Sequence, residues 1–310
     1  MDILTIILII AGLCVFEVIS SVDNAIINAD VLSTMQAKYR KWFLYFGIFF
    51  AVFVIRGILP WLIIWISTPS AGPIGAFTSS FSSNPRIMEN IRQSSPVLLI
   101  GSATFLLFLF FHWLFLEPKK VILPGETFFQ SNYYLFYAFV SILLSAIVWF
   151  ALHKNSIMAF GAVIGATVYY VVDSCRKYAE ENSRNLHKSN LSDMSKILYL
   201  EVLDGSFSID GVTGAFAFTL SVPLILIGNG LGALVVRQLT LKNINSINKY
   251  RYLKKGAMYS IFFLSIIMLL DSFGFVIPSW LPPLVTFAVV GYFFYISKRY
   301  IKKHFDKSIS

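Results

Sequence analysis

The chain has 310 residues, of which 57 % are apolar and only 13 % are charged, and its mean hydropathy is +0.72. Soluble domains carry about 25 % charged residues, so this composition excludes an ordinary soluble protein and predicts an integral membrane protein. The net charge of +9 comes from basic residues in short connections and at the C-terminus, which favours membrane orientation over a nucleic-acid partner. We find no phosphate-binding glycine loop, nucleophile elbow or HExxH motif, and therefore expect neither an enzyme nor an organic cofactor.

Apolar runs recur along the chain at lengths near the roughly 20 residues that a helix needs to cross a bilayer. They predict an all-α fold, a polytopic membrane helical bundle of about nine transmembrane helices: residues 3–33, 43–66, 96–116, 133–152, 156–175, 196–221, 223–239, 257–276 and 282–297. Connections rich and poor in Lys and Arg alternate, which places the N-terminus outside and the C-terminus inside. We therefore expect a multi-pass protein of the cell inner (plasma) membrane.

The whole chain is predicted to form a single transmembrane transporter domain. Its parts would be a first repeat, connecting helices with an inner loop, a second repeat, and a final helix with a basic tail: residues 1–116, 117–195, 196–276 and 277–310. Residues 67–95 are rich in Ser, Pro, Gly and Asn, which favours an external loop, with a partly re-entrant cap as the alternative. Residues 176–195 are polar and charged, which indicates a solvated, short-helical linker between the halves.

Two stretches place acids inside apolar segments, and in each a pair of acids is six positions apart: Glu17 with Asp23, and Asp204 with Asp210. An ionised group in hydrocarbon costs at least about 2.5–3.5 kcal/mol, so such residues need a function or a partner. The helices that carry the two stretches would cross the membrane in opposite directions. This arrangement predicts an inverted repeat, relating helices 1–3 to helices 6–8, with a shared site near the midplane.

The donors in both stretches are carboxylate, amide and hydroxyl groups, which suit Mg²⁺, Ca²⁺ or Mn²⁺. On a straight helix Glu17 and Asp23 would point about 120° apart. Because Ser, Asp, Asn and Gly weaken helices, we expect local unwinding at residues 20–24 and 205–211 that would let both acids face one cation. The structural alternative is that the acids only form ion pairs that fix the bundle.

Further polar residues accompany the acids. Arg56 and Arg237 follow the two stretches at similar distances. We interpret them as structural partners of the carboxylates or as side chains that extend to the membrane interface, in preference to substrate ligands. Asp271 could be a proton-relay group or a solvated boundary residue. The supporting or pathway residues are Ser20, Ser21, Ser208, Arg56, Arg237 and Asp271.

Three motifs resemble those of the TerC family of integral membrane proteins, named for tellurium resistance, and of a longer uncharacterised branch within it. They are Glu17 with Ser21-Val-Asp-Asn-Ala25, then Leu200-Glu-Val-Leu-Asp-Gly-Ser-Phe-Ser-Ile-Asp210, then Val222-Pro-Leu-Ile-Leu-Ile-Gly-Asn-Gly-Leu-Gly-Ala-Leu-Val-Val-Arg237. The resemblance implies membership of the LysE-like transporter superfamily and export of Mn²⁺. By motif matching it implies metal ligation by Glu17, Asp23, Asn24, Glu201, Asp204 and Asp210. The chain departs from the family in its extra helices and in Met258, which stands where we expect His.

These observations lead to the hypothesis of a secondary transporter that exports a divalent metal cation, with Mn²⁺ favoured and Ca²⁺ or Mg²⁺ open. The cation would be the substrate, and the lipid bilayer the surrounding partner. Two alternatives stay open: a proton-coupled exporter of a small organic solute, and a non-transporting membrane scaffold in a metal- or tellurite-stress complex. Homo-oligomers and membrane-complex partners, the coupling ion and the direction of transport also stay open.

Overall fold

The structure is a computed structural model and describes residues 2–47, 56–67, 72–74, 85–119, 123, 125–186, 192–242 and 252–306. Within these residues the regular structure is helical and contains no strand. Six helical segments are long and apolar enough to cross a membrane: Ile3–Ser20, Gln93–Leu116, Tyr133–Leu152, Ser156–Tyr178, Leu253–Ser272 and Leu281–Lys302. The chain is therefore an all-α, multi-pass membrane protein, as the sequence predicts.

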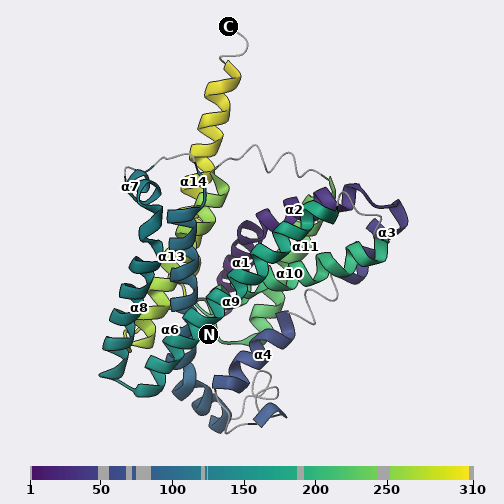
Figure 1. Ribbon diagram of the computed structural model, residues 1–310. Helices are drawn as coiled ribbons and strands as arrows, with labels where there is room; N and C mark the ends of the chain where they lie inside the picture. Colours follow the sequence, from purple (N-terminus) through teal and green to yellow (C-terminus); the bar gives the residue numbers. More distant parts are fainter. Residues whose placement is uncertain are drawn as a thin grey trace.

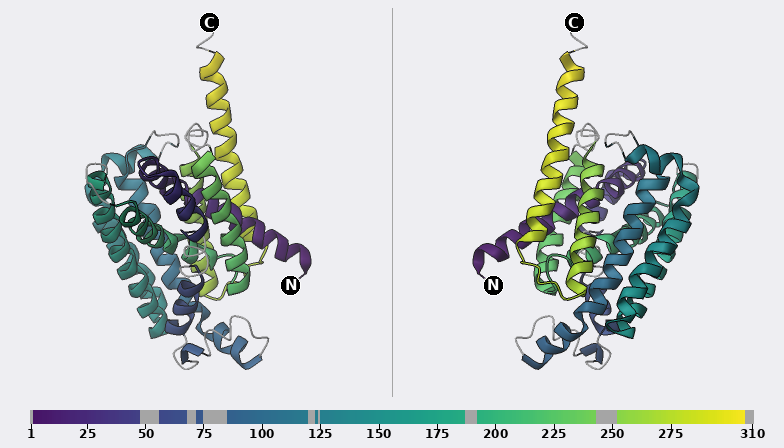
Figure 2. Two further views of the ribbon diagram at one scale, coloured as in Figure 1. Left: turned by 90° about the vertical axis from the view of Figure 1, so that its right-hand side faces the viewer. Right: turned by 90° about the vertical axis from the view of Figure 1, so that its left-hand side faces the viewer.

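Figure 1 shows the helices and labels the α-helices. They are α1 (Ile3–Ser20), α2 (Val22–Ser33), α3 (Ala37–Trp42), the π-helix η1 (Phe43–Gly47), α4 (Arg56–Ser67), α6 (Pro85–Leu116), α7 (Glu126–Ser131), the 3-10 helix η4 (Tyr133–Leu135), α8 (Phe136–Leu152), α9 (Ser156–Leu186), α10 (Asp193–Ala215), α11 (Val222–Lys242), α13 (Leu253–Ser272) and α14 (Leu281–Asp306). The C-terminal part of α14 projects beyond the other helices in all three views (Figure 1 and Figure 2).

The first acidic stretch contains a helix break that is shorter than predicted. Helix α1 ends at Ser20 and α2 begins at Val22, with Ser21 between them at φ −90° and ψ 3°. The backbone N–H of Ala25 already donates to the carbonyl of Ser21 at 2.9 Å. The break is thus confined to Ser21, because a new helix starts directly after it.

The predicted unwinding of residues 205–211 is wrong, since α10 is continuous from Asp193 to Ala215. The hydroxyls of this helix bond back onto it: Ser208 Oγ donates to the Asp204 carbonyl at 2.8 Å, and Thr213 Oγ1 to the Ile209 carbonyl at 2.7 Å. These local hydrogen bonds satisfy the side chains without opening the backbone.

Two predicted loops are partly helical. Residues 85–95, assigned to the external loop, form the start of α6, where Pro85 occupies the first helical position, a place that tolerates the missing N–H of proline. The predicted linker after residue 175 continues as helix α9 to Leu186. These residues are thus helical as a continuation of the 31-residue helix α9 and not as a separate short helix, and the extra turns carry Arg176 alongside the other helices.

One group of helices surrounds an apolar core. Helix α6 packs against α9 and α13, and α8 covers α9. The core is rich in buried aromatic side chains, including Phe105, Phe108, Phe110, Trp113 and Tyr169. Helices α6 and α9 cross so closely that a Cβ on Gly161 would lie 2.8 Å from the carbonyl oxygen of Val97.

A second group brings the acidic stretches together. Helix α1 packs along α11, and α10 contacts both α1 and α2. Phe16 lies against Gly214, Glu17 against Gly211, and the N–H of Gln36 donates to Asp193 Oδ2 at 3.1 Å. Residue numbers thus rise along α1 and α2 as they fall along α10, so the helices that carry the two acidic stretches are antiparallel.

Candidate functional site

The side chain of Glu17 fits into the space left by glycines of two other helices. The residue is only 1 % exposed. A Cβ on Gly211 of α10 would lie 2.6 Å from Glu17 Oε2, and a Cβ on Gly232 of α11 would lie 2.6 Å from Glu17 Cβ. Ser21 Oγ donates to Glu17 Oε1 at 2.8 Å, and Ser20 Oγ donates to the Glu17 carbonyl at 3.2 Å. The helix break after α1 thus supplies a hydroxyl to a carboxylate held at the junction of α1, α10 and α11.

Glu201 and Asp204 share the guanidinium of Arg237. Arg237 Nη2 lies 3.4 Å from Glu201 Oε1 and 3.3 Å from Asp204 Oδ2, and all three side chains are buried. Arg237 Nη1 donates to the Phe43 carbonyl at 2.8 Å, and the guanidinium lies 4.3 Å from the centre of the Phe43 ring. The interpretation of Arg237 as a partner of the acids agrees with this geometry.

The π-helix η1 closes this group of charges. A Cβ on Gly47 would overlap the Glu201 carboxylate and the Arg237 guanidinium, so an alanine there would push both charged groups aside. The Phe43 carbonyl and ring, at the other end of η1, hold Arg237 from the same side. A π-helix inside or beside an α-helix is often found at functional sites.

Asp210 has a different partner, Arg176 of α9. Arg176 Nη2 and Asp210 Oδ2 are 2.6 Å apart, with side chains 13 % and 14 % exposed. Asp210 directly precedes Gly211, the residue against which the Glu17 carboxylate lies. Sequence reasoning missed Arg176 as a partner because it was assigned to the inner linker; the signal would have been a helix that continues past residue 175.

The four acids of known position therefore occupy three neighbouring places. Glu201, Asp204, Ser208 and Gly211 fall on one face of α10, as the spacing of three, four and three residues requires. Seven residues of helix separate Asp204 from Gly211, which is roughly 10.5 Å along the axis. Among the residues that the structure describes, no three His, Cys, Asp or Glu side chains form a group that could hold a metal ion.

The remaining predicted site residues differ in what is described of them. Asp23 and Asn24 lie in the first turn of α2, and Arg56 begins α4, but the side chains of these three residues lie outside the described part. Ser208 is buried and bonded to its own helix. Asp271 is exposed at the C-terminal end of α13, which favours the solvated boundary residue over the relay group.

The chain was compared with known proteins. A family model described as "Protein of unknown function (DUF475)" matches residues 22–304. The chain belongs to the DUF475 family. No curated protein and no solved structure matches it.

In this DUF475 chain several buried polar residues escaped the sequence analysis. Asn229 is 0 % exposed, and its Nδ2 donates to the Gly211 carbonyl at 3.3 Å. Asn28 on α2 is also buried. Far from the acids in sequence, Glu126 forms a buried ion pair with Lys255 and accepts a hydrogen bond from Tyr259 at 3.0 Å. For Asn229 the available signal was a polar residue within an apolar run.

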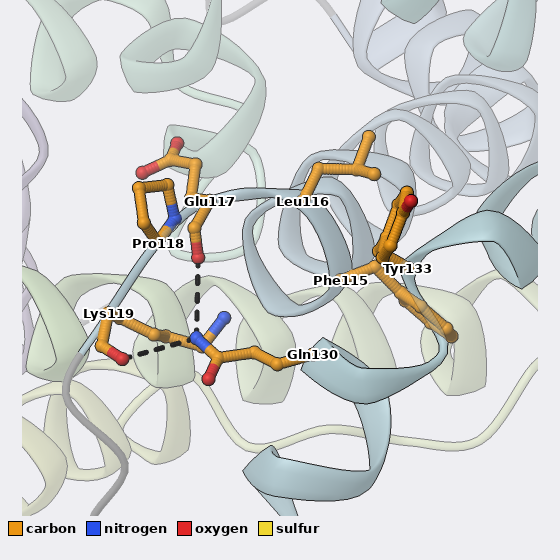
Figure 3. Close-up of a pocket in the computed structure, with 7 residues that line it drawn as sticks. All are labelled: Phe115, Leu116, Glu117, Pro118, Lys119, Gln130 and Tyr133. Atoms are coloured by element: carbon orange, nitrogen blue, oxygen red, sulfur yellow. Dashed lines mark hydrogen bonds between the residues drawn. The ribbon is translucent and has the colours of Figure 1, made fainter.

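The DUF475 chain also has a pocket of about 350 Å³ at the end of α6, shown in Figure 3. Gln130 of α7 crosses it and donates to the carbonyls of Lys119 at 3.2 Å and Glu117 at 3.5 Å. None of its lining residues belongs to the predicted site: Phe115, Leu116, Glu117, Pro118, Lys119, Gln130 and Tyr133. The pocket is therefore separate from the predicted acidic site.

Proposed function

We propose that this DUF475 protein is a secondary transporter that exports a divalent metal cation, with Mn²⁺ as the first candidate substrate before Ca²⁺ and Mg²⁺. The proposal includes nine crossings of the inner membrane, an inverted repeat of helices 1–3 and 6–8, and alternating access around the acids. Asp23, Asn24, Glu17, Glu201, Asp204 and Asp210 would be the cation ligands, as the resemblance to the TerC family implies.

The observation that carries the proposal is that Glu17, Glu201, Asp204 and Asp210 occupy neighbouring places along two antiparallel helices, α1 and α10, within the apolar bundle. Intramembrane carboxylates are expensive and usually belong to ion pathways or proton relays. Their oxygen atoms are the hard donors that Mn²⁺, Ca²⁺ and Mg²⁺ prefer. The attraction between a bound cation and these carboxylates would offset the cost of burying them in the membrane.

Arg237 could exchange with an entering cation for the carboxylate oxygens of Glu201 and Asp204. Its contacts with Glu201 and Asp204, at 3.4 and 3.3 Å, are longer than the roughly 2.7–2.9 Å of a strong charged hydrogen bond. One guanidinium is shared by two carboxylates. A divalent cation that entered would compete with Arg237 for these oxygens, and the guanidinium would keep its contacts with Phe43. Arg237 would thus hold the acids together in the metal-free protein.

The proposal is tested by transport in proteoliposomes that contain the purified full-length protein, with cellular Mn, Ca and Mg measured alongside. We expect Mn²⁺ flux with the wild-type protein and its loss in Asp204→Asn. Glu89→Gln, which changes an exposed acid on α6, serves as the matched control and should transport normally. Unchanged cellular metal levels together with no flux of any of the three cations would refute transport.

The ion pairs also favour one second candidate, a non-transporting membrane protein whose acids only hold the bundle. Arg176 binds Asp210 at 2.6 Å, a tight pair that could be purely structural. The two candidates predict different effects of Asp210→Asn. If the protein is a transporter, Asp210→Asn should lose flux but keep its melting temperature within a few degrees. If it is a scaffold, Asp210→Asn should yield little folded protein, and the wild type should co-purify with partners.

A further inference from the structure

Two buried oxygen atoms next to Gly211 have no hydrogen-bond partner in the part of the chain that the structure describes. They are Oδ1 of Asn229, a residue that is 0 % exposed, and Oδ1 of Asp210. Buried polar atoms in native proteins are nearly always bonded to protein, water or an ion. A pair of such oxygens beside one glycine therefore points to a ligand.

The orientation of the Asn229 amide follows from its contact with α10. Its Nδ2 lies 3.3 Å from the Gly211 carbonyl, and only the NH₂ side of an amide can donate to a carbonyl. The carbonyl side, Oδ1, is thus the half of the amide that is left over. The amide is fixed in place while its acceptor stays open.

Asn229 stands at the same three-helix junction as Glu17. Gly232, one turn later on α11, touches Cβ of Glu17, and Gly211, which Asn229 contacts, touches the Glu17 carboxylate. Arg237 is eight positions further along α11, which is roughly 12 Å along the helix axis. Asn229 therefore lies at the same helix junction as Glu17 and well away from the guanidinium that holds Glu201 and Asp204.

We propose that Asn229 is a ligand of the transported cation, and that its Oδ1 joins the carboxylates of Glu17 and Asp210 in a subsite around Gly211. This inference rests on the proposed function and extends it to a residue outside the acidic motifs. The subsite takes a dehydrated divalent cation with hard-oxygen preference. A neutral amide oxygen adds a ligand without adding a charge, so the cation is bound but can also leave.

The experiment measures equilibrium Mn²⁺ binding to purified full-length protein in detergent, for the wild type and for Asn229→Leu and Asn229→Asp. The two variants are close in size, and both lose the Nδ2 donor to Gly211. A difference in Mn²⁺ affinity between them therefore cannot come from that lost hydrogen bond. Only Asp keeps an oxygen at the position. We expect Asn229→Leu to bind Mn²⁺ about 10- to 100-fold more weakly than wild type. Asn229→Asp should bind at least as tightly as wild type.

Thr286→Val is the matched control. It removes a different buried oxygen, the Thr286 hydroxyl on α14, which also has no partner among the described residues. It should leave Mn²⁺ affinity unchanged. If Asn229→Leu does not fold, as judged by its metal-free melting temperature, Asn229→Ala replaces it with the same expected loss.

The outcomes separate the inference from the function on which it rests. Equal Mn²⁺ affinity in the wild type, the Leu or Ala variant and the Asp variant overturns the role of Asn229, with water as the partner of its Oδ1, and leaves the transporter proposal in place. A wild-type protein that binds none of Mn²⁺, Ca²⁺ and Mg²⁺ contradicts the proposed function itself, and the Asn229 subsite with it.

Discussion

Glycines line both the crossing of α6 with α9 and the junction of α1, α10 and α11, but they make room for different things. At the first, Gly101, Gly161 and Gly165 let backbone carbonyls of one helix reach the other, which is how membrane helices gain close packing. At the second, Gly211 and Gly232 make room for the carboxylate and stem of Glu17. An added methyl group should therefore damage assembly at the first place and ligand chemistry at the second.

Gly165→Leu is expected to have the largest effect on folding. A Cβ at this position would already overlap the carbonyl of Gly101, which is backbone and cannot rotate away. The cost should exceed the roughly 1–3 kcal/mol of ordinary overpacking, and little monodisperse protein should remain in size-exclusion chromatography. Gly57→Ala is the control, since its nearest neighbour would be Leu226 Cδ2 at 3.7 Å. A well-folded Gly165→Leu protein would refute the close crossing.

The helices around the aromatic core also contain a buried ion pair, between α7 and α13, and breaking it should be costly. Glu126 and Lys255 are 1 % and 4 % exposed and form an ion pair. Lys255→Met should destabilise the protein by about 3–5 kcal/mol, because it leaves a buried carboxylate without its cation. The double variant Glu126→Leu/Lys255→Met should recover most of this loss. Thermal unfolding of the two variants decides, and additive losses would contradict a coupled pair.

Gly211→Ala should separate binding from folding at the acidic junction. The new methyl would press on Glu17 Oε2 at 2.6 Å, the far end of a side chain that can shift, so the loss of stability should stay within about 1–3 kcal/mol. Mn²⁺ affinity should fall about tenfold or more. Adding Glu17→Ala should restore the melting temperature but not the binding. If Gly211→Ala binds Mn²⁺ normally, the glycine serves packing alone.

The comparison of these two regions also shows what the sequence can predict. Apolar length identifies membrane helices because hydrocarbon thickness fixes it. The helix period puts Glu201, Asp204 and Ser208 on one face of α10 because that helix is continuous. Opposite charge in the same apolar context suggested Arg237 as a partner of the acids. These features depend on local sequence or on simple physical limits of the bilayer.

The features that escaped prediction depend on tertiary contacts. Gly211 reads as a helix breaker in isolation, but in the fold it lies against Glu17, and α10 stays continuous around it. Arg176 reads as part of a polar linker until α9 continues far enough to bring it to Asp210. The pair of Glu126 and Lys255 joins residues 129 positions apart, and no local pattern links them.

Lys119, just after the C-terminal end of α6, allows the smallest effect to be measured. Burial lowers the pKa of its amine from 10.5 to about 8, partly opposed by the charge of Glu126. Between these pH values the unfolded chain holds more protons than the folded protein, so stability should rise with pH across that window. Because the amine is only partly buried, solvent screens much of this effect, and we expect a gain on the order of 1 °C in melting temperature.

Lys119→Met removes the amine, so its melting temperature should lack this rise between pH 8 and 10.5. The amine also donates to the Leu114 carbonyl at 2.7 Å and lies 4.2 Å from the centre of the Trp113 ring. These contacts favour the charged form and act against the desolvation. If the melting temperature of the wild type does not rise with pH relative to that of Lys119→Met, these contacts outweigh the desolvation of the amine. The aromatic core then tolerates a positive charge at its edge without loss of stability.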